Sequence, residues 1–142
     1  MSVRELVYLR MSTDTELSAL GLTGATLYAN GAPDSPQERF WGVLRWGIEI
    51  PGVRAQRGRD RVTDRECTLW VYNKSPEYDP INSAIKRWCA ILDALEATKT
   101  GDAATDGWIL TCEWTADIDD GYDDVYEAWY RSSGYRIIAS GD

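Results

Sequence analysis

The feature that most constrains the fold is an amphipathic segment in the second half of the chain. Large apolar residues recur there at steps of four, three, four and three, namely Ile81, Ile85, Trp88, Leu92 and Leu95. This spacing places all five on one stripe of an α-helix, about 20 Å long. Asp79 is a favourable N-cap, Pro80 suits the first helical position, and Gly101 with the polar run 102–106 is predicted to end the helix. Such a stripe needs a second apolar surface to cover it.

Four segments with a period of two are predicted to form that surface as β-strands. They cover residues 40–48, 66–72, 108–114 and about 127–139, and they are rich in β-branched and aromatic side chains. The expected core-facing set of the second is Cys67, Leu69 and Val71, and that of the third is Trp108, Leu110, Cys112 and Trp114. The fourth is interrupted near 132–134, where Gly134 indicates a bulge or bend.

The N-terminal part adds smaller elements. Ser12 or Thr13 is expected to cap a short helix that ends at Gly21, with Glu16 reaching back to the cap, and residues 27–31 are expected to form a brief strand. Strands that follow one another with few crossovers indicate an α+β fold. We expect a mostly antiparallel β-sheet with one long amphipathic helix packed on one face and a short N-terminal helix, all in a single domain over residues 1–142.

Composition excludes most catalytic chemistry. Histidine is absent, which removes Ser-His-Asp and Cys-His mechanisms and His-ligated metals. Cys67, Cys89 and Cys112 have no CxxC spacing, so buried reduced thiols are expected. The glycines form no nucleotide-binding pattern, and no two carboxylates, such as Glu113 with Asp117, stand out as an acid/base pair. We therefore expect no enzyme activity, no catalytic residues, no metal and no cofactor.

The net charge and the hydropathy of the chain limit the classes of partner that it is expected to bind. The formal net charge of −8 disfavours nucleic acid and anionic membrane as adhesive partners. No run approaches 18 apolar residues, so no membrane span is expected, and the start lacks the apolar centre of a signal peptide. The three cysteines, expected as reduced thiols, fit synthesis in a reducing cytoplasm.

The most acidic stretch, residues 117–124, is expected to be a loop. It carries Asp117, Asp119, Asp120, Asp123 and Asp124. A calcium loop of the EF-hand type fits poorly, because Gly121 and Glu127 each fall one position short of the required places. The readings left open are a solvated loop between strands and an acidic surface that faces a partner.

An arginine-rich stretch lies between two predicted strands and resembles a long hairpin loop with Gly58 at its tip. Its basic residues are Arg54, Arg57, Arg59, Arg61 and Arg65, and Asp60 and Asp64 reduce its local balance to +3. A solvated loop, a phosphate contact and docking onto carboxylates of another subunit all remain open. If the basic and acidic stretches meet within one molecule they form an internal clamp. If they meet between molecules, the contact is head to tail and closes into a ring or continues as a filament.

Aromatic residues add candidate interface anchors. The chain has seven Trp and eight Tyr but one Phe, and Trp and Tyr suit interfaces as well as cores. Trp41, Trp70, Tyr72 and Trp129 are expected on strand faces that the helix does not cover, where they can anchor a partner.

Three strings of sequence resemble a known protein family. They are FWGVLRWG (40–47), CTLWVYNKSPEYDPINSAIKRWCAILDALEA (67–97) and YRIIASGD (135–142). Together they resemble tail terminator proteins of long non-contractile-tailed phages, nearest to those of actinobacterial phages. The resemblance implies a small α+β subunit of a hexameric ring in the tail and neck of a virion, assembled in the host cytoplasm.

In that family the ring binds the last ring of the major tail tube protein, stops its polymerisation and presents a surface to head-tail connector proteins. DNA only passes through the channel, and a long loop between strands takes part in ring or tube contacts. The segment 51–65 is the nearest match to that loop. Two alternatives stay open: a head-completion or neck adaptor of the same particle, and a non-viral cytosolic binding module.

Overall fold

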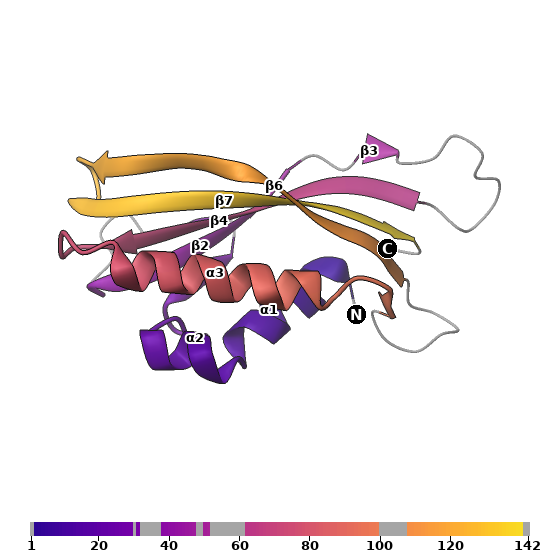
Figure 1. Cartoon of the computed structure of the whole chain (residues 1–142), viewed down its shortest axis with the longest axis horizontal. Helices are drawn as coiled ribbons and strands as arrows, with labels where there is room; N and C mark the ends of the chain where they lie inside the picture. Colours follow the sequence, from indigo (N-terminus) through magenta and orange to yellow (C-terminus); the bar gives the residue numbers. More distant parts are fainter. Residues whose placement is uncertain are drawn as a thin grey trace.

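The sheet and its helices form two layers. In the computed structural model, which describes residues 2–29, 31, 38–47, 50–51, 62–99 and 108–140, all helices lie on one face of a long twisted sheet (Figure 1). The helices are α1 (Val3–Ser12), α2 (Thr15–Leu20) and α3 (Asp79–Asp93). The strands are β1 (Leu27–Ala29), β2 (Phe40–Trp46), β3 (Ile50–Pro51), β4 (Val62–Asn73), β5 (Thr98–Lys99), β6 (Trp108–Asp123) and β7 (Ala128–Ser140).

The sheet is antiparallel except at one edge. Its strand order is β1-β2-β4-β7-β6-β5, β3 pairs with β4, and β1 runs parallel to β2. This confirms the predicted α+β class, with two short N-terminal helices in place of one. β4 and β7 pair along their whole length, from Val62 opposite Ser140 to Asn73 opposite Trp129, and they form the centre of the sheet.

The main core lies between the helices and the sheet. Ile81, Ile85, Trp88 and Leu92 of α3 are buried against Cys67, Leu69 and Val71 of β4, and Leu95 is buried just after the helix. Burying each large apolar side chain of α3 contributes about 1.5–3 kcal/mol, which makes this stripe the main anchor of the helix. The predicted stripe and the predicted inward face of β4 are confirmed.

A second, smaller cluster lies on the opposite, helix-free face of the sheet. Trp41, Val43, Tyr72 and Ala128 are buried there, with Tyr28, Trp70, Tyr126 and Tyr130 packed around them. The rings of Trp41 and Tyr72 stack with centroids 5.1 Å apart. Aromatic pairs in this geometry add about 0.5–1.5 kcal/mol beyond their area burial, so both faces of the sheet carry apolar packing.

The capping prediction for the N-terminal helix was wrong in its residues. Asp14 is the N-cap of α2 and accepts from the Leu17 N–H at 3.0 Å, whereas Ser12 belongs to α1. An Asp carboxylate caps as well as Ser or Thr and adds a favourable charge at the helix N-terminus. The predicted end at Gly21 is confirmed, because this residue has φ 107° and closes α2 in the left-handed region that glycine adopts without strain.

The bounds of α3 also differ from the prediction. Tyr78 is the N-cap and Asp79 is already helical, and the helix ends at Asp93, well before Gly101. The chain leaves the helix in a turn with Ala97 at φ 60°, and Thr98–Lys99 then pairs with Trp108 and Ile109. The helix was predicted to end near Gly101, but Thr98 and Lys99 pair with β6 instead.

The largest correction concerns β6. Residues 117–123 continue this strand and pair with β7, so the acidic stretch is not a loop, and only Asp124 lies in the turn. Register shifts between Ile109 and Thr111, Trp114 and Ala116, and Asp117 and Asp119 insert extra residues. Each extra residue reverses the alternation of faces. Ile109 and Cys112 are consequently both buried, while Trp114 is 54% exposed. The irregularity predicted near Gly134 lies in β6 opposite it, and β7 itself is continuous.

Candidate interaction surface

The acidic stretch forms one end of a long β-hairpin. We call residues 113–127 the acidic hairpin: the second half of β6 and the turn that joins it to β7. Beyond Trp108 and Ile109, which pair with β5, the outer side of β6 has no strand next to it among the described residues. The segment 113–124 contains one Glu and five Asp and no Lys or Arg. The structure therefore places five carboxylates along a sheet edge and a sixth, that of Asp124, in the turn that follows it.

The aspartates differ in how they are held. Asp117 forms an ion pair with Arg131, which also donates to Asn82 of α3. Asp119 accepts from the Tyr130 hydroxyl at 2.8 Å, and Asp123 accepts from the N–H groups of Val125 and Tyr126. The carboxylates of the two remaining members, Asp120 and Asp124, have no hydrogen bond or ion pair within the described residues, and both side chains are exposed. These two are free to pair with a cation from outside.

The carboxylates act on the tyrosines beside them. The pKa of Tyr130 is raised by its hydrogen bond to Asp119, by burial and by the nearby charges of Asp119, Asp123 and Asp120. Burial and the charge of Asp120 likewise raise the pKa of Tyr78. The Asp119, Asp123 and Asp120 charges contribute to the shift of Tyr130, and the Asp120 charge adds to the effect of burial at Tyr78.

Exposed apolar side chains gather on the same hairpin. Among the described residues five large hydrophobic side chains are exposed, and four of them, Trp114, Ile118, Tyr122 and Val125, belong to it. Tyr122 packs edge-on against Trp129 with ring centroids 5.0 Å apart, and Tyr78 contacts Trp129 from the start of α3. The Tyr78 hydroxyl donates to the Gly121 carbonyl at 3.2 Å. Apolar exposure combined with charge is typical of an interaction surface.

The predicted aromatic anchors divide into three groups. Trp41 and Tyr72 are 0% and 3% exposed, so they belong to the subunit's own packing and leave almost no area for a partner. Trp70 is half-buried on the helix-free face, with the Arg45 guanidinium 5.2 Å from its ring centroid. Trp129 points to the helix-bearing side, contrary to the prediction, because it alternates with Ala128 and Tyr130 of the helix-free cluster.

Most of the arginine-rich stretch lies outside the described residues. This holds for Arg54, Arg57, Arg59 and Arg61. Arg65 is part of β4 rather than of a loop, is 8% exposed, and has its guanidinium 5.8 Å from the Trp46 ring centroid. The extent of β4 explains this, because its pairing with β7 begins at Val62.

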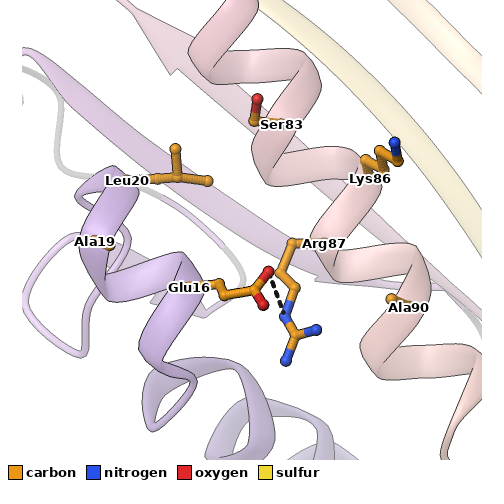
Figure 2. Close-up of a pocket in the computed structure, with 7 residues that line it drawn as sticks. All are labelled: Glu16, Ala19, Leu20, Ser83, Lys86, Arg87 and Ala90. Atoms are coloured by element: carbon orange, nitrogen blue, oxygen red, sulfur yellow. Dashed lines mark ion pairs between the residues drawn. The ribbon is translucent and has the colours of Figure 1, made fainter.

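The sequence did not indicate a groove between α2 and α3, which Figure 2 shows. Its volume is about 510 Å³, and it is lined by Glu16, Ala19, Leu20, Ser83, Lys86, Arg87 and Ala90. Arg87 crosses it from α3 and binds Asp14 at 2.7 Å and Glu16 at 3.5 Å. The groove is spanned by an ion pair that joins two helices, so its evident role is structural.

Other site types find little support in the described ranges. No group of three or more Cys, Asp or Glu there could hold a metal ion, and no helix there is long and apolar enough to cross a membrane. Ser132 and Ser133 are fully buried, and their hydroxyls accept hydrogen bonds from the Asp119 N–H and the Trp114 indole. They hold the irregular part of β6 against β7.

Comparison with known proteins identifies a fold. No protein-family model and no curated protein matches the sequence. Eleven chains of solved structures match the structure. One is a chain from the virion of a native gene transfer agent particle, with a TM-score of 0.67, 15% sequence identity, and coverage of 99% of this chain and 96% of that one. From end to end, this chain has the fold of a protein found in that virion.

Proposed function

We propose that the chain is a structural protein of a phage-like virion, and within it a tail terminator. It would form a hexameric ring that caps the tail tube, stops its polymerisation and offers a docking surface to the head and neck. The observation that carries this proposal is the fold shared over 99% of the chain with a gene transfer agent virion chain. The likeness of three sequence strings to tail terminators of long non-contractile-tailed phages supports the finer role.

The surface is compatible with such a role. Its most distinctive region is an acidic hairpin with exposed aromatic and aliphatic side chains rather than a concave site with convergent polar groups. Its proposed partners are copies of itself, the major tail tube protein and the head-tail connector, and its proposed location is the neck end of the tail. The basic residues Arg54, Arg57, Arg59 and Arg61, the acidic hairpin and the exposed aromatics are proposed as contacts, and Arg65, which is buried in β4, is not.

Tube capping is the test. Purified chain is added to tail-tube subunits during polymerisation, and tube lengths are measured by electron microscopy. A terminator shortens the tubes in proportion to its concentration and is found at their ends. Mass photometry of the chain alone is expected to show a six-fold species. Binding to a connector without any effect on tube length would favour a neck adaptor, and neither ring nor capping would favour an unrelated binding module.

The channel gives a second check. Six chains of formal charge −8 each sum to about −48, a field that repels DNA phosphates. We expect acidic side chains to outnumber basic ones on the wall of the channel, so that DNA passes without adhering. A ring structure with an arginine-lined channel would contradict this expectation.

A further inference from the structure

The outer edge of β6 is uncovered along the acidic hairpin. Eight consecutive residues, 113–120, are all exposed, although they belong to a paired strand. Because successive side chains of a strand point to opposite faces, neither face of this part of β6 is covered by another layer. No strand lies on its outer side among the described residues, and Figure 1 shows β6 at the border of the sheet where it turns into β7.

The regular part of this edge can bond to another strand. Register shifts interrupt β6 up to Asp119, and residues 119–123 then pair with β7 without a further shift. The Asp119 N–H donates to the Ser132 hydroxyl at 3.0 Å and the Asp119 carbonyl accepts from it at 3.3 Å, so both backbone groups are directed toward β7. In an antiparallel ladder the backbone groups of successive residues turn to opposite sides, so those of Asp120 and Tyr122 are directed to the open side. The Asp120 N–H bonds to the Asp119 carboxylate at 2.9 Å. The Asp120 carbonyl and both backbone groups of Tyr122 are therefore the ones that an added strand can bond.

The side chains beside this edge determine which strand fits it. The segment 113–124 has six carboxylates and no Lys or Arg. Those of Asp120 and Asp124 are exposed and have no hydrogen bond or ion pair within the described residues. Tyr122 packs edge-on against Trp129, and such aromatic surface accepts the aliphatic stem or the charged end of a basic side chain. Carboxylates pair most strongly with Arg and Lys, so the fitting strand is basic.

Charge also separates this strand from a second copy of the same edge. Two acidic edges placed side by side repel, and native edge strands are protected from such pairing by bulges and charged side chains, both of which β6 has. The strand at the other edge of the sheet, β1, is Leu27–Ala29 and has no basic side chain. Neither edge in the strand order of the described sheet supplies a basic strand, which favours a different protein as the partner.

From these observations we infer that the acidic hairpin binds an extended basic segment of a different protein, which adds as a strand to the edge of β6 at residues 119–123. Backbone hydrogen bonds hold the segment in place, as in other cases of strand addition. Asp120 and Asp124 bind its Arg or Lys side chains, and Tyr122 contacts their stems. The inference gives the chemistry of one partner, and it rests on the proposed function only for the partner's place in the particle.

A synthetic peptide tests both parts of the contact. The probe is a fluorescent peptide of about eight residues in which Arg and Val alternate, a length that matches one strand. Fluorescence anisotropy is expected to show saturable binding to the chain at about 150 mM salt, where long-range attraction is screened. The matched control peptide has the same sequence but is N-methylated at every peptide nitrogen, which keeps the charges and removes the backbone donors. Its affinity is expected to be at least about tenfold lower.

Variants of the chain locate the site. D120K/D124K is expected to weaken binding of the unmethylated peptide at least about tenfold. E16K/E96K changes the net charge equally but on the helical layer, and it is the control that is expected to retain the affinity within about twofold. Tyr122→Pro should weaken binding more than Tyr122→Ala, because both remove the ring and only proline removes the N–H on the open side. Proline is tolerated at such a position of an edge strand.

The outcomes separate this inference from the proposed function. Equal binding of the methylated peptide overturns strand addition, and equal binding to a folded D120K/D124K overturns the role of the carboxylates. Self-association of the unmodified chain that D120K/D124K abolishes would assign the edge to a second copy and overturn the choice of a different protein. Capping of tubes by a chain that binds no peptide would leave the terminator role and remove this contact, and peptide binding without capping would do the reverse. D120N/D124N is the milder variant if circular dichroism shows that the lysine substitutions prevent folding.

Discussion

At the residue scale, single polar side chains fix how elements meet. Asp14 caps α2 through the Leu17 N–H and binds the Arg87 guanidinium of α3 at 2.7 Å, so one carboxylate serves a helix end and an ion pair between helices. Tyr135 has a similar double role, since its buried hydroxyl lies 2.7 Å from an Asp93 carboxylate oxygen and 3.1 Å from the Cys89 carbonyl oxygen and shares its single proton between these two acceptors. Neither pairing follows from local sequence, because the partners are 73 and 42 to 46 residues apart.

Replacing Asp14 should separate the cap from the ion pair. Asp14→Ala removes both and is expected to lower the free energy of unfolding by about 1–2 kcal/mol at neutral pH, most of it from the cap. Asp14→Asn keeps a good cap and removes the charge, so its loss is expected to be smaller. Urea unfolding followed by tryptophan fluorescence measures both. Equal losses in the two variants would show that the cap contributes little.

The pH dependence of the free energy of unfolding shows whether the ion pair between Asp14 and Arg87 stabilises the fold. The hydrogen bond from Arg87 lowers the pKa of Asp14 below its ordinary value of 3.8. A carboxyl whose pKa is lower in the folded chain stabilises the fold above its unfolded pKa, and this contribution disappears as the pH falls through the folded value. The stability gap between the unmodified chain and Asp14→Asn should therefore be constant from pH 7 to about 5 and close below about 4. A gap that widens on acidification would contradict this assignment.

At the element scale, β6 depends on close packing at Gly134 of β7. A Cβ atom added there would lie 3.0 Å from the Thr115 hydroxyl oxygen and 3.2 Å from the Ile118 side chain, both from the bulged part of β6. We therefore expect that the absence of a side chain at Gly134 allows the bulged part of β6 to pair closely with β7. This is a steric requirement, since its backbone conformation is not one that needs glycine.

Gly134→Ala should therefore destabilise the hairpin. Overpacking of this kind costs about 1–3 kcal/mol, read as a shift of the urea midpoint. Gly24→Ala is the matched control, because an added Cβ at Gly24 meets no atom within 4 Å, and it is expected to change stability by less than about 0.5 kcal/mol. Hydrogen exchange would localise the effect to β6 and the middle of β7. Unchanged exchange there would show that Thr115 and Ile118 move aside without cost.

The elements also show what local sequence could predict. The alternation in β4 predicted correctly that Cys67, Leu69 and Val71 face the helices while Trp70 and Tyr72 face the other side. In a regular strand, successive side chains point to opposite faces, so position alone decides the face. Residues 117–123 were predicted as a loop because Asp and Gly are rare in strands, and pairing with β7 overrides that preference. The irregularity near Gly134 was predicted, but its position in β6 rather than in β7 was not, since a bulge depends on the register of both strands. The acidic stretch was visible in composition, but its place on β6 was not.

At the scale of the whole molecule, charge is unevenly distributed on a chain of net −8. Carboxylates concentrate at one end of the sheet, while the arginine-rich stretch, with a local balance of +3, begins at the other. The overall negative field of the chain opposes binding to polyanions. The two properties are separable by experiment, because one depends on where the charges lie and the other on their sum.

Binding to duplex DNA tests the effect of the net charge of the chain. Non-specific DNA binding at physiological salt has dissociation constants of about 10⁻⁴–10⁻⁶ M and comes from phosphate contacts by Lys and Arg. We expect no retardation of a DNA duplex in gel electrophoresis at chain concentrations up to about 10⁻⁴ M, because the net charge repels the phosphates. E16K/E96K, at net −4, should behave in the same way. Retardation that weakens linearly with the logarithm of salt concentration would contradict the prediction. Loss of that retardation in R57E/R59E would then assign the arginine-rich stretch to phosphate contacts.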